Sequence, residues 1–464
     1  MSRAKFTDVG EVACDRRHAL VFEHGWQSWS PSGAYRLDDT PPRAADATIQ
    51  VLAYRPETPV PPGVFQGEGL LAVDPGDGGP VHLWSAPGHL AVPSIRARRA
   101  GDDTLVISAD GPVSHWRAEG PLDTALAGWA DTMAAPVAPA ISVIPPLWCS
   151  WYGYWDKVTE SDVTENLSLA DRHGIDLDLF LIDDGYETGI GDWLDVRPAF
   201  GSLERAVGAI ADSGRRSGIW VAPFLVGRHS RLYEEHPGWT VPGVSAGHMW
   251  DQDLAVLDVT RPAAAEHLAG VFRELTALGI AHFKLDYIYA GAMPGRRHDG
   301  AGPIAAYRRG LELIREATGP GAVIHGCGAP LLPSLGLVDV MRVSPDTAPR
   351  RMPRHGDISQ PSQLGARLTG EAREFLHARW WVNDPDCLIV RPEVETREEW
   401  AAHIESSGGL RGASDPIAAL DAWGLETTRR LMTPTRPDPS GPPPLARPWS
   451  TEAIVTAGPG TATP

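Results

Sequence analysis

The chain has 464 residues, and its hydrophobic content of 42% is enough to bury a large core. Asp and Glu number 59 against 41 Lys and Arg, so the formal net charge is −18 and nucleic-acid binding is disfavoured. No long apolar run suits a bilayer span, and no signal core follows Met1, so we expect no membrane partner and a cytoplasmic location. The cysteines are far apart and predict reduced thiols; they are Cys14, Cys149, Cys327 and Cys387.

Short β-type runs separated by Pro and Gly turns follow one another from His18 to about Ala118. The runs are Ala19–Phe22, Thr48–Leu52, Val81–Trp84 and Thr104–Ile107. They predict a compact β-sandwich. A helix is expected from Leu122 to Ala135, and the Pro-rich stretch up to Pro146 is expected to be a linker. We therefore assign residues 1–135 to an N-terminal β-sandwich domain with its linking helix.

After Pro146 the pattern changes to strand, loop and helix in repetition. A capping box at Thr159–Asp162 opens a helix that ends near Gly174, and Thr260 with Pro262 opens another that ends at Gly279. The expected strands are Leu147–Tyr152, Asp178–Ile182, Gly218–Phe224, His282–Asp286, Ala322–His325, Val338–Val343, Ala378–Val382 and, more weakly, Ser406–Leu410.

Apolar strands that alternate with amphipathic helices indicate a parallel sheet covered by helices, which is an α/β architecture. About eight repeats fit a closed (β/α)8 TIM barrel, here residues 136–433, better than an open sheet. The active site of such a barrel lies at the carboxyl ends of its strands. The Pro- and Gly-rich stretch 434–464 is expected to be an extended C-terminal tail.

Ionisable and aromatic residues gather at these expected strand ends. Asp286 and Asp346 each follow an apolar run and each has a cation close by in sequence, Lys284 and Arg342. Cleavage of a glycosidic bond needs two carboxyl groups in different protonation states, so this pair is a candidate catalytic pair. The other residues at strand ends are Trp151, Tyr152, Asp183, Asp184, Trp220, Cys327, Asn383 and Asp384.

Ionisable residues at one rim could also serve a metal-dependent or a Schiff-base reaction. Metal-dependent hydrolases on barrels usually supply histidines, but the chain has no His-x-His pair, and Lys284 and Arg342 would repel a cation. We therefore expect no metal. A Schiff-base role for Lys284 needs a lowered pKa, which the neighbouring Asp286 opposes. A sugar site uses the same residues better, with Asp183 and Asp184 as hydroxyl acceptors, Lys284 and Arg342 as donors, and Trp220 and Tyr152 as walls.

Seven segments, in order along the chain, carry a family resemblance. They are Trp148–Tyr152, Ile182–Tyr186 with Gly191–Leu194, Gly218–Phe224, Phe283–Tyr287 with Ala290–Gly291, Gly326–Gly328, Met341–Pro349 and Asn383–Cys387. In these segments the chain resembles glycoside hydrolase family 36, the α-galactosidases of clan D. The resemblance implies a retaining enzyme without a cofactor that acts on terminal α-galactosides. The sequence leaves open whether the protein forms a homo-oligomer.

By the same resemblance Asp286 matches the nucleophile and Asp346 the general acid/base. Substrate-binding positions carry over onto Asp183, Asp184, Tyr152, Trp220, Lys284, Cys327 and Arg342. One tryptophan of the N-terminal domain, Trp26 or Trp29, is expected over the site. Gly153, Arg350 and Arg351 depart from the family pattern, which leaves the leaving-group contacts open. An α-N-acetylgalactosaminidase, a galactosyl-transferring enzyme and an inactive carbohydrate-binding barrel remain the alternatives.

Overall fold

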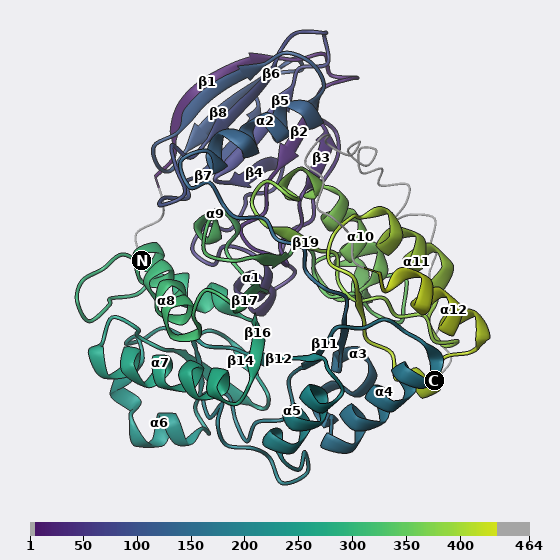
Figure 1. The fold of residues 1–464 in the computed structure, drawn as a ribbon. Coiled ribbons are helices and arrows are strands. Elements are labelled where there is room, and N and C mark those ends of the chain that lie inside the picture. Colours follow the sequence, from purple (N-terminus) through teal and green to yellow (C-terminus); the bar gives the residue numbers. More distant parts are fainter. Residues whose placement is uncertain (1–4, 434–464) are drawn as a thin grey trace.

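The computed structural model describes residues 5–433, and in it a β-sandwich stands on one end of a larger barrel (Figure 1). The first sandwich sheet has the strand order β1 (Thr7–Ala13), β8 (Thr104–Ala109), β7 (Ser94–Arg99), β4 (Val64–Glu68). The second has the order β3 (Gly33–Arg36), β2 (Leu20–Glu23), β5 (Leu70–Asp74), β6 (Val81–Ser85), β9 (Ser114–Ala118). All neighbours are antiparallel, and their inward residues, such as Val21, Leu71 and Ile107, form a buried core.

One predicted strand of the sandwich is wrong. Residues 48–52 lie in helix α1 (Ala47–Ala53), not in a strand. The β-branched residues Thr48, Ile49 and Val51 favour a strand locally, but the Asp46 side chain accepts hydrogen bonds from the backbone N–H groups of Thr48 and Ile49. The first N–H groups of a helix have no acceptor within the helix, and the Asp46 N-cap supplies an acceptor for two of them. The predicted linking helix is confirmed as α2 (Leu122–Ala134).

The barrel is a sheet of eight parallel strands, which confirms the predicted (β/α)8 fold. The ends of the sheet meet where Leu410 N–H donates to the Asn383 carbonyl at 2.8 Å. In order around the sheet, the strands are β10 (Leu147–Cys149), β11 (Leu179–Ile182), β12 (Arg216–Val221), β16 (Ile280–Leu285), β17 (Val323–Gly326), β18 (Val340–Arg342), β19 (Val382–Asp384) and β20 (Gly412–Ala413).

Helices follow the strands and surround the barrel (Figure 1). They are α3 (Trp151–Tyr154), α4 (Glu160–His173), α5 (Leu203–Asp212), α6 (Arg231–Glu235), α7 (Pro262–Ala277), α8 (Pro303–Thr318), α9 (Leu331–Ser334), α10 (Gln363–Glu371), α11 (Arg397–Ser406) and α12 (Ala422–Leu431). The capping box predicted for α4 is present, with Thr159 and Asp162 bonded to each other's backbone N–H. Short 3₁₀ turns lie at 155–157, 237–239, 288–292, 354–356, 374–376 and 417–419.

The last two barrel strands are displaced from their predicted positions. In the predicted strand Ala378–Val382, Trp380 packs against α2 and its Nε1–H donates to the Ala130 carbonyl at 2.9 Å. The seventh strand therefore starts only at Val382. Helix α11 runs through Ser406, so the eighth strand follows at 412–413. The predicted tail 434–464 lies outside the described residues.

Between β12 and β16 the chain makes an excursion that the sequence did not predict. It contains α6 and a small antiparallel sheet of β13 (Leu225–Gly227), β15 (Gln252–Val256) and β14 (His248–Met249). The turn after β14 holds Trp250 and Asp251 in the left-handed region, with φ of 50° and 53°. This turn brings Trp250 to the barrel rim, next to Asp184.

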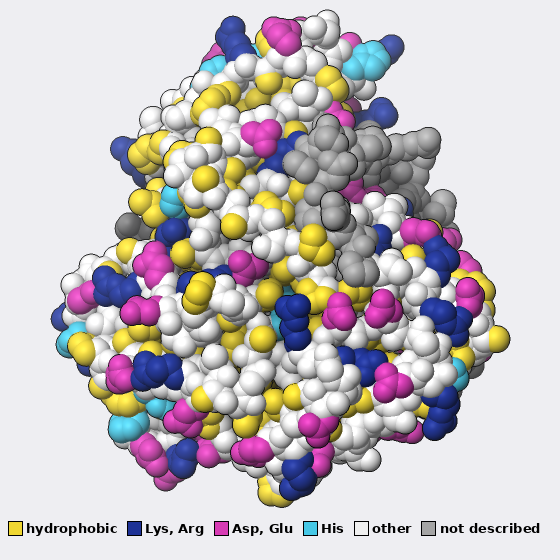
Figure 2. Space-filling view, in the orientation of Figure 1, with side chains coloured by type: hydrophobic (Ala, Val, Ile, Leu, Met, Phe, Trp, Pro, Cys, Tyr) yellow, Lys and Arg dark blue, Asp and Glu magenta, His cyan; other side chains and the backbone are white. Residues whose placement is uncertain are grey.

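The sandwich contacts the barrel through residues 25–31, which we call the Trp29 loop. This loop pairs with the segment after β17: Ser28 N–H donates to the Ala329 carbonyl at 3.0 Å and Leu331 N–H to the Trp26 carbonyl at 3.1 Å. Figure 1 shows α1 and α9 at the same junction. On the face in Figure 2, acidic and basic side chains are interspersed over the barrel. No helix among residues 5–433 has the length and apolar character needed to cross a membrane.

Candidate active site

Asp286 follows β16 at the carboxyl end of the barrel and is held by two N–H donors. The Trp220 indole at the end of β12 donates to Oδ2 at 3.0 Å, and the Tyr287 backbone N–H donates to Oδ1 at 2.8 Å. Tyr287 has φ 51°, a conformation that costs an ordinary side chain about 1–2 kcal/mol. Such strain is found where a site requires one backbone direction. Both carboxylate oxygens therefore accept a hydrogen bond from an uncharged group.

Lys284 and Asp183 form a buried ion pair on the floor of the site. The distance from Lys284 Nζ to Asp183 Oδ2 is 2.7 Å, and the side chains are 6% and 2% exposed. Cys149 Sγ also donates to this oxygen, at 3.2 Å. Burial opposes the charge of Lys284, but the Asp183 carboxylate outweighs it, so the pKa of the ammonium lies well above its usual range. A raised pKa is the opposite of what a Schiff-base lysine requires.

Asp184 lies beside this pair and has two further neighbours. Trp250 Nε1–H donates to its Oδ2 at 2.9 Å, and burial raises its pKa. The nearby Glu187 is also buried, and burial together with the Asp184 carboxylate raises the pKa of Glu187 well above its usual range. The pKa values of both carboxyl groups are therefore raised in this buried pair. Gly185 has φ 112°, and a Cβ there would come within 2.6 Å of the Asp156 backbone, so only glycine fits this turn.

Asp346 has a different environment, dominated by charges. Arg342 Nη1 donates to its Oδ1 at 2.8 Å, and the same guanidinium pairs with Asp384 at 3.1 Å and with Asp386 at 2.8 Å. Burial raises the pKa of Asp346 to about 6 even though Arg342 opposes the shift, and the Asp386 carboxylate raises it further. In Asp384, Arg342 and His325 outweigh burial and hold the pKa well below its usual range. Asp346 is therefore the carboxyl group that titrates near neutrality.

Tyr152 belongs to this second group. Its hydroxyl donates to Asp386 Oδ2, and the ring is almost fully buried. Thr347 N–H donates to the same Asp386 oxygen at 2.7 Å, one residue beyond Asp346. The predicted sugar wall at Tyr152 thus carries a hydroxyl committed to Asp386. The sequence had placed Asp386 in a matching segment but not among the site residues.

Cys327 and Tyr287 connect the two carboxylates. Burial raises the pKa of the Cys327 thiol well above its usual range, and both Asp286 and Asp346 raise it further. The pKa of the Tyr287 phenol is raised by burial and by the same two carboxylates. Asp286 and Asp346 therefore act on the same two side chains.

The two candidate tryptophans of the N-terminal domain lie in different places. The Trp29 ring meets Tyr287 edge to face, with 4.8 Å between ring centroids. The Trp26 ring is 6% exposed and lies under the Arg55 guanidinium, 5.5 Å from the ring centroid. The structure therefore brings Trp29, and not Trp26, to Asp346 and Tyr287.

Trp29 and Asp346 share a hollow of about 160 Å³. Its other lining residues come from α1, from the end of β14, and from the segments after β16 and β18: Leu52, Ala53, Met249, Tyr287, Pro345, Ser359, Gln360 and Pro361. Arg350, one of the departures from the family pattern, donates to the Pro361 carbonyl at 2.9 Å and so braces one wall. The lining is apolar apart from Asp346, Tyr287, Ser359 and Gln360.

Sequence reasoning missed several neighbours of the predicted residues. Tyr287 and Asp386 lie in segments that the resemblance covers, so local sequence held a signal for them. Trp250 and Glu187 reach Asp184 through turns of the chain that no pattern in the sequence predicts. Within residues 5–433, no group of three or more His, Cys, Asp or Glu side chains could hold a metal ion.

Comparison with known proteins agrees with this geometry. Residues 142–297 match the family model described as melibiase. A curated relative, α-galactosidase C of Emericella nidulans, is 27% identical over 184 residues, which is 34% of this chain and 24% of the relative. The chain thus spans about a quarter of the length of the curated relatives it matches.

Solved structures extend the likeness to nearly the whole chain. The α-galactosidase of Thermus thermophilus in complex with p-nitrophenyl α-D-galactopyranoside is 28% identical, with a TM-score of 0.78 over 92% of this chain and 89% of that one. A family 36 α-galactosidase of Geobacillus stearothermophilus shares the fold at 14% identity, with a TM-score of 0.61 over 91% of this chain and 61% of that one.

The barrel with its carboxylate-lined rim is thus similar in fold to the α-galactosidase of Thermus thermophilus. The family model is described as melibiase, and the curated relative and the two solved structures named above are described as α-galactosidases.

Proposed function

We propose that the protein hydrolyses terminal, non-reducing α-galactosyl residues with net retention, as a member of family 36. The observation that carries this proposal is the contrast between the two carboxyl groups at one barrel rim. Asp286 accepts hydrogen bonds on both oxygens, whereas Asp346 has a pKa of about 6. A double displacement needs one carboxylate that attacks and one acid that gives and later takes back a proton.

In the proposed first step, Asp286 attacks the anomeric carbon while protonated Asp346 donates its proton to the leaving oxygen. The glycosidic bond breaks and a β-linked glycosyl ester of Asp286 forms. In the second step, Asp346 takes a proton from water as the water oxygen attacks the same carbon and releases Asp286. The sugar keeps its α configuration because the centre inverts twice.

The remaining predicted residues bind the galactosyl ring in this proposal. Asp183 and Asp184 accept hydrogen bonds from sugar hydroxyls, while Lys284 and Arg342 supply donors. Trp220 and Trp29 offer indole faces to the apolar side of the ring. The hollow lined by Leu52, Ala53, Met249 and Pro361 opens beside Asp346, so it is where we place the leaving group.

The roles of the two carboxyl groups are tested by azide rescue. For Asp286→Ala, azide should restore turnover of p-nitrophenyl α-galactoside and give β-galactosyl azide, because it attacks in place of the missing nucleophile. For Asp346→Ala, azide should give α-galactosyl azide, because it attacks the glycosyl-enzyme. The reverse pattern would exchange the two assignments. No azide product from either variant would contradict a covalent intermediate.

Substrate choice is tested on the unmodified enzyme. We expect turnover of p-nitrophenyl α-galactoside to exceed that of its N-acetyl analogue, since the buried Cys327 and the Trp29 ring against Gly328 leave this part of the rim closely packed. A preference for the N-acetyl sugar, or galactosyl transfer in excess of hydrolysis, would favour the alternatives. Binding without turnover of either substrate would indicate a carbohydrate-binding barrel.

A cytoplasmic location is part of the proposal. Its support is that all four cysteines are buried and free of disulfides. Fractionation of the producing cells, followed by an assay of each fraction, tests this location. Activity confined to the medium would contradict it.

A further inference from the structure

We infer that Arg373 is a positioning residue for substrate binding: its guanidinium clamps the Trp29 loop onto the barrel and so holds Trp29 over the sugar site. This inference rests on the proposed function. Arg373 follows α10 and is fully buried. Among the described residues it forms no ion pair, and burial lowers the pKa of its guanidinium to about 9. A buried cation without a carboxylate is costly, so a compensating role is expected.

The compensation comes from four backbone carbonyls. Nη1 donates to Ser28 O at 2.6 Å and to Val343 O at 2.8 Å. Nη2 donates to Gln27 O at 3.0 Å and to Ser30 O at 2.7 Å. Three of these carbonyls belong to the Trp29 loop and flank Trp29 itself. The planar guanidinium reaches all four at once, which the three donors of a lysine ammonium cannot do.

The fourth carbonyl ties the loop to the catalytic side of the barrel. Val343 follows β18 and lies three residues before Asp346. The Arg373 backbone is itself held, since Asn383 Nδ2 on β19 donates to the Arg373 carbonyl at 3.1 Å. Arg373 therefore joins the loop that carries Trp29 to the segment after β18 through its side chain and to β19 through its backbone.

The loop is shaped to close over this guanidinium. A Cβ at Gly25 would stand 2.7 Å from Arg373 Nη2 and 2.5 Å from the Ser30 Cβ. A side chain there would push the loop and the guanidinium apart. Glycine at this position is therefore required by the clamp.

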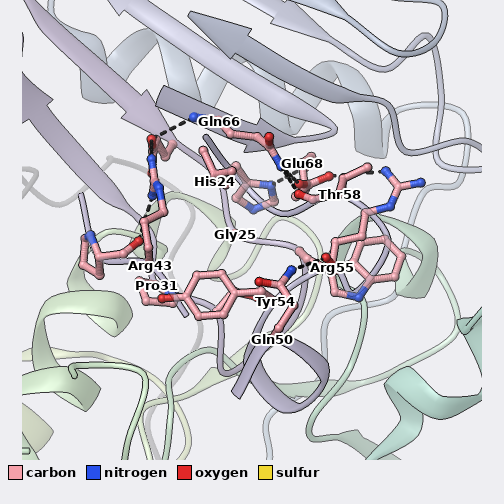
Figure 3. Close-up of a pocket in the computed structure, with 15 residues that line it drawn as sticks. His24, Gly25, Pro31, Arg43, Gln50, Tyr54, Arg55, Thr58, Gln66 and Glu68 are labelled. Carbon is pink, nitrogen blue, oxygen red and sulfur yellow. Dashed lines mark hydrogen bonds and ion pairs between the residues drawn. The ribbon is translucent and has the colours of Figure 1, made fainter. Parts of the chain in front are cut away.

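At Gly25 and Pro31, the loop borders a small polar cavity (Figure 3). The cavity has a volume of about 30 Å³ and is lined by His24, Gly25 and Pro31 of this region, facing polar side chains such as Arg43 and Glu68. A space of this size holds a water molecule but no side chain. At this cavity the loop is not held by packing, so its position depends on the Arg373 hydrogen bonds and on its pairing with residues 329–331.

Trp29 transmits the position of the loop to the site. A Cβ at Gly328 would lie 2.8 Å from the Trp29 ring, which shows how closely the indole approaches the backbone after Cys327. The ring also touches Tyr287, the residue after Asp286. A shift of the loop by one ångström would move the indole against both neighbours and change the wall that the sugar meets.

A double-mutant cycle between Arg373→Lys and Trp29→Ala tests the clamp. With p-nitrophenyl α-galactoside, Arg373→Lys should raise KM about tenfold with a smaller change in kcat, and the double variant should be no worse than Trp29→Ala alone. Arg411→Lys is the matched control, because Arg411 is also buried and also donates to a backbone carbonyl, that of Glu405, at the opposite end of the barrel. It should lower Tm and leave KM unchanged.

Two outcomes would overturn the inference. One is an unchanged KM in folded Arg373→Lys. The other is a double variant whose KM increase equals the product of the increases in Arg373→Lys and Trp29→Ala. If the unmodified protein does not cleave galactosides, the proposed function fails and the clamp is judged by hydrogen exchange. Arg373→Lys should then accelerate exchange of the Ser28 and Ser30 amides, and Arg411→Lys should not. Equal exchange in both variants would reject the clamp independently of activity.

Discussion

The two carboxyl groups of the site have different kinds of neighbours. Asp286 accepts hydrogen bonds from an indole and a backbone amide, both uncharged. Asp346 lies at the edge of a charged cluster in which Arg342 forms ion pairs with three carboxylates. Neutral donors thus satisfy both oxygens of Asp286 as hydrogen-bond acceptors. A shared cation and nearby carboxylates instead make protonation of Asp346 depend on its neighbours, and its pKa of about 6 suits a group that exchanges a proton in each cycle.

The leaving group provides the largest test of this contrast. Asp286→Ala should lose at least about 10⁴-fold in kcat on every galactoside, because no covalent step is possible without the nucleophile. Asp346→Ala should lose about 10²–10⁴-fold on a sugar leaving group and much less on p-nitrophenol, which leaves without protonation. Comparing stachyose with the aryl substrate measures this difference. Equal losses of Asp346→Ala on both would argue against its role as the acid.

The floor of the site predicts the next largest effect. Lys284→Met would leave the Asp183 carboxylate buried without its cation, and breaking a buried pair costs about 3–5 kcal/mol. We expect a lower Tm and a loss of galactoside binding, read from thermal unfolding with and without the sugar. Arg205→Met is the control, because its pair with Glu160 is at the surface and should matter little. A Tm for Lys284→Met as high as that of the control would contradict a stabilising role for the pair.

Local patterns predicted the parts of the fold in which one signal dominates. The capping box of Thr159 and Asp162 and the apolar runs of β11 and β16 gave correct elements. The errors fell where a distant contact decides. Trp380 is buried against α2 and not inside a barrel strand, and the Asp46 cap makes a helix from residues that favour a strand.

The same distinction holds for the site. Asp286, Asp346 and Asp183 follow strands and Lys284 lies near the end of β16, so barrel topology brings them to one rim. Trp250 arrives by an irregular turn and Trp29 from another part of the chain, and their positions depend on contacts that sequence spacing does not encode. The pairing of Lys284 was also predicted only in part: its direct partner is Asp183, while Asp286 has a smaller effect on its pKa.

A pH profile sharpens the comparison at Asp346. Bond cleavage needs protonated Asp346, so kcat/KM for stachyose should fall as pH rises through its pKa of about 6. Asp386 raises that pKa, so Asp386→Asn should lower it and move the alkaline limb to lower pH. Asp258→Asn, a buried carboxylate at the start of α7, should leave the limb in place. An alkaline limb that moves upward in Asp386→Asn would contradict this coupling.

The smallest expected effect is on the free energy of unfolding, in which Asp346 and Asp286 should differ in sign. The pKa of Asp346 rises from 3.8 to about 6 on folding, so its ionisation destabilises the native state as pH rises from about 4 to 6 and by a constant amount above that, about 3 kcal/mol at most. Asp346→Asn removes this cost, and urea unfolding should show it to be more stable than the unmodified enzyme at pH 7.5 but not at pH 4.

Asp286→Asn is the matched variant. Its carboxylate accepts on both oxygens, so an amide would turn an N–H toward the Trp220 indole or the Tyr287 amide and lose about 1–3 kcal/mol at pH 7.5. Substitutions of the same chemistry should therefore change stability in opposite directions. A gain for both would mean that burial alone governs the two carboxyl groups, and that the neutral donors around Asp286 do not set it apart from Asp346.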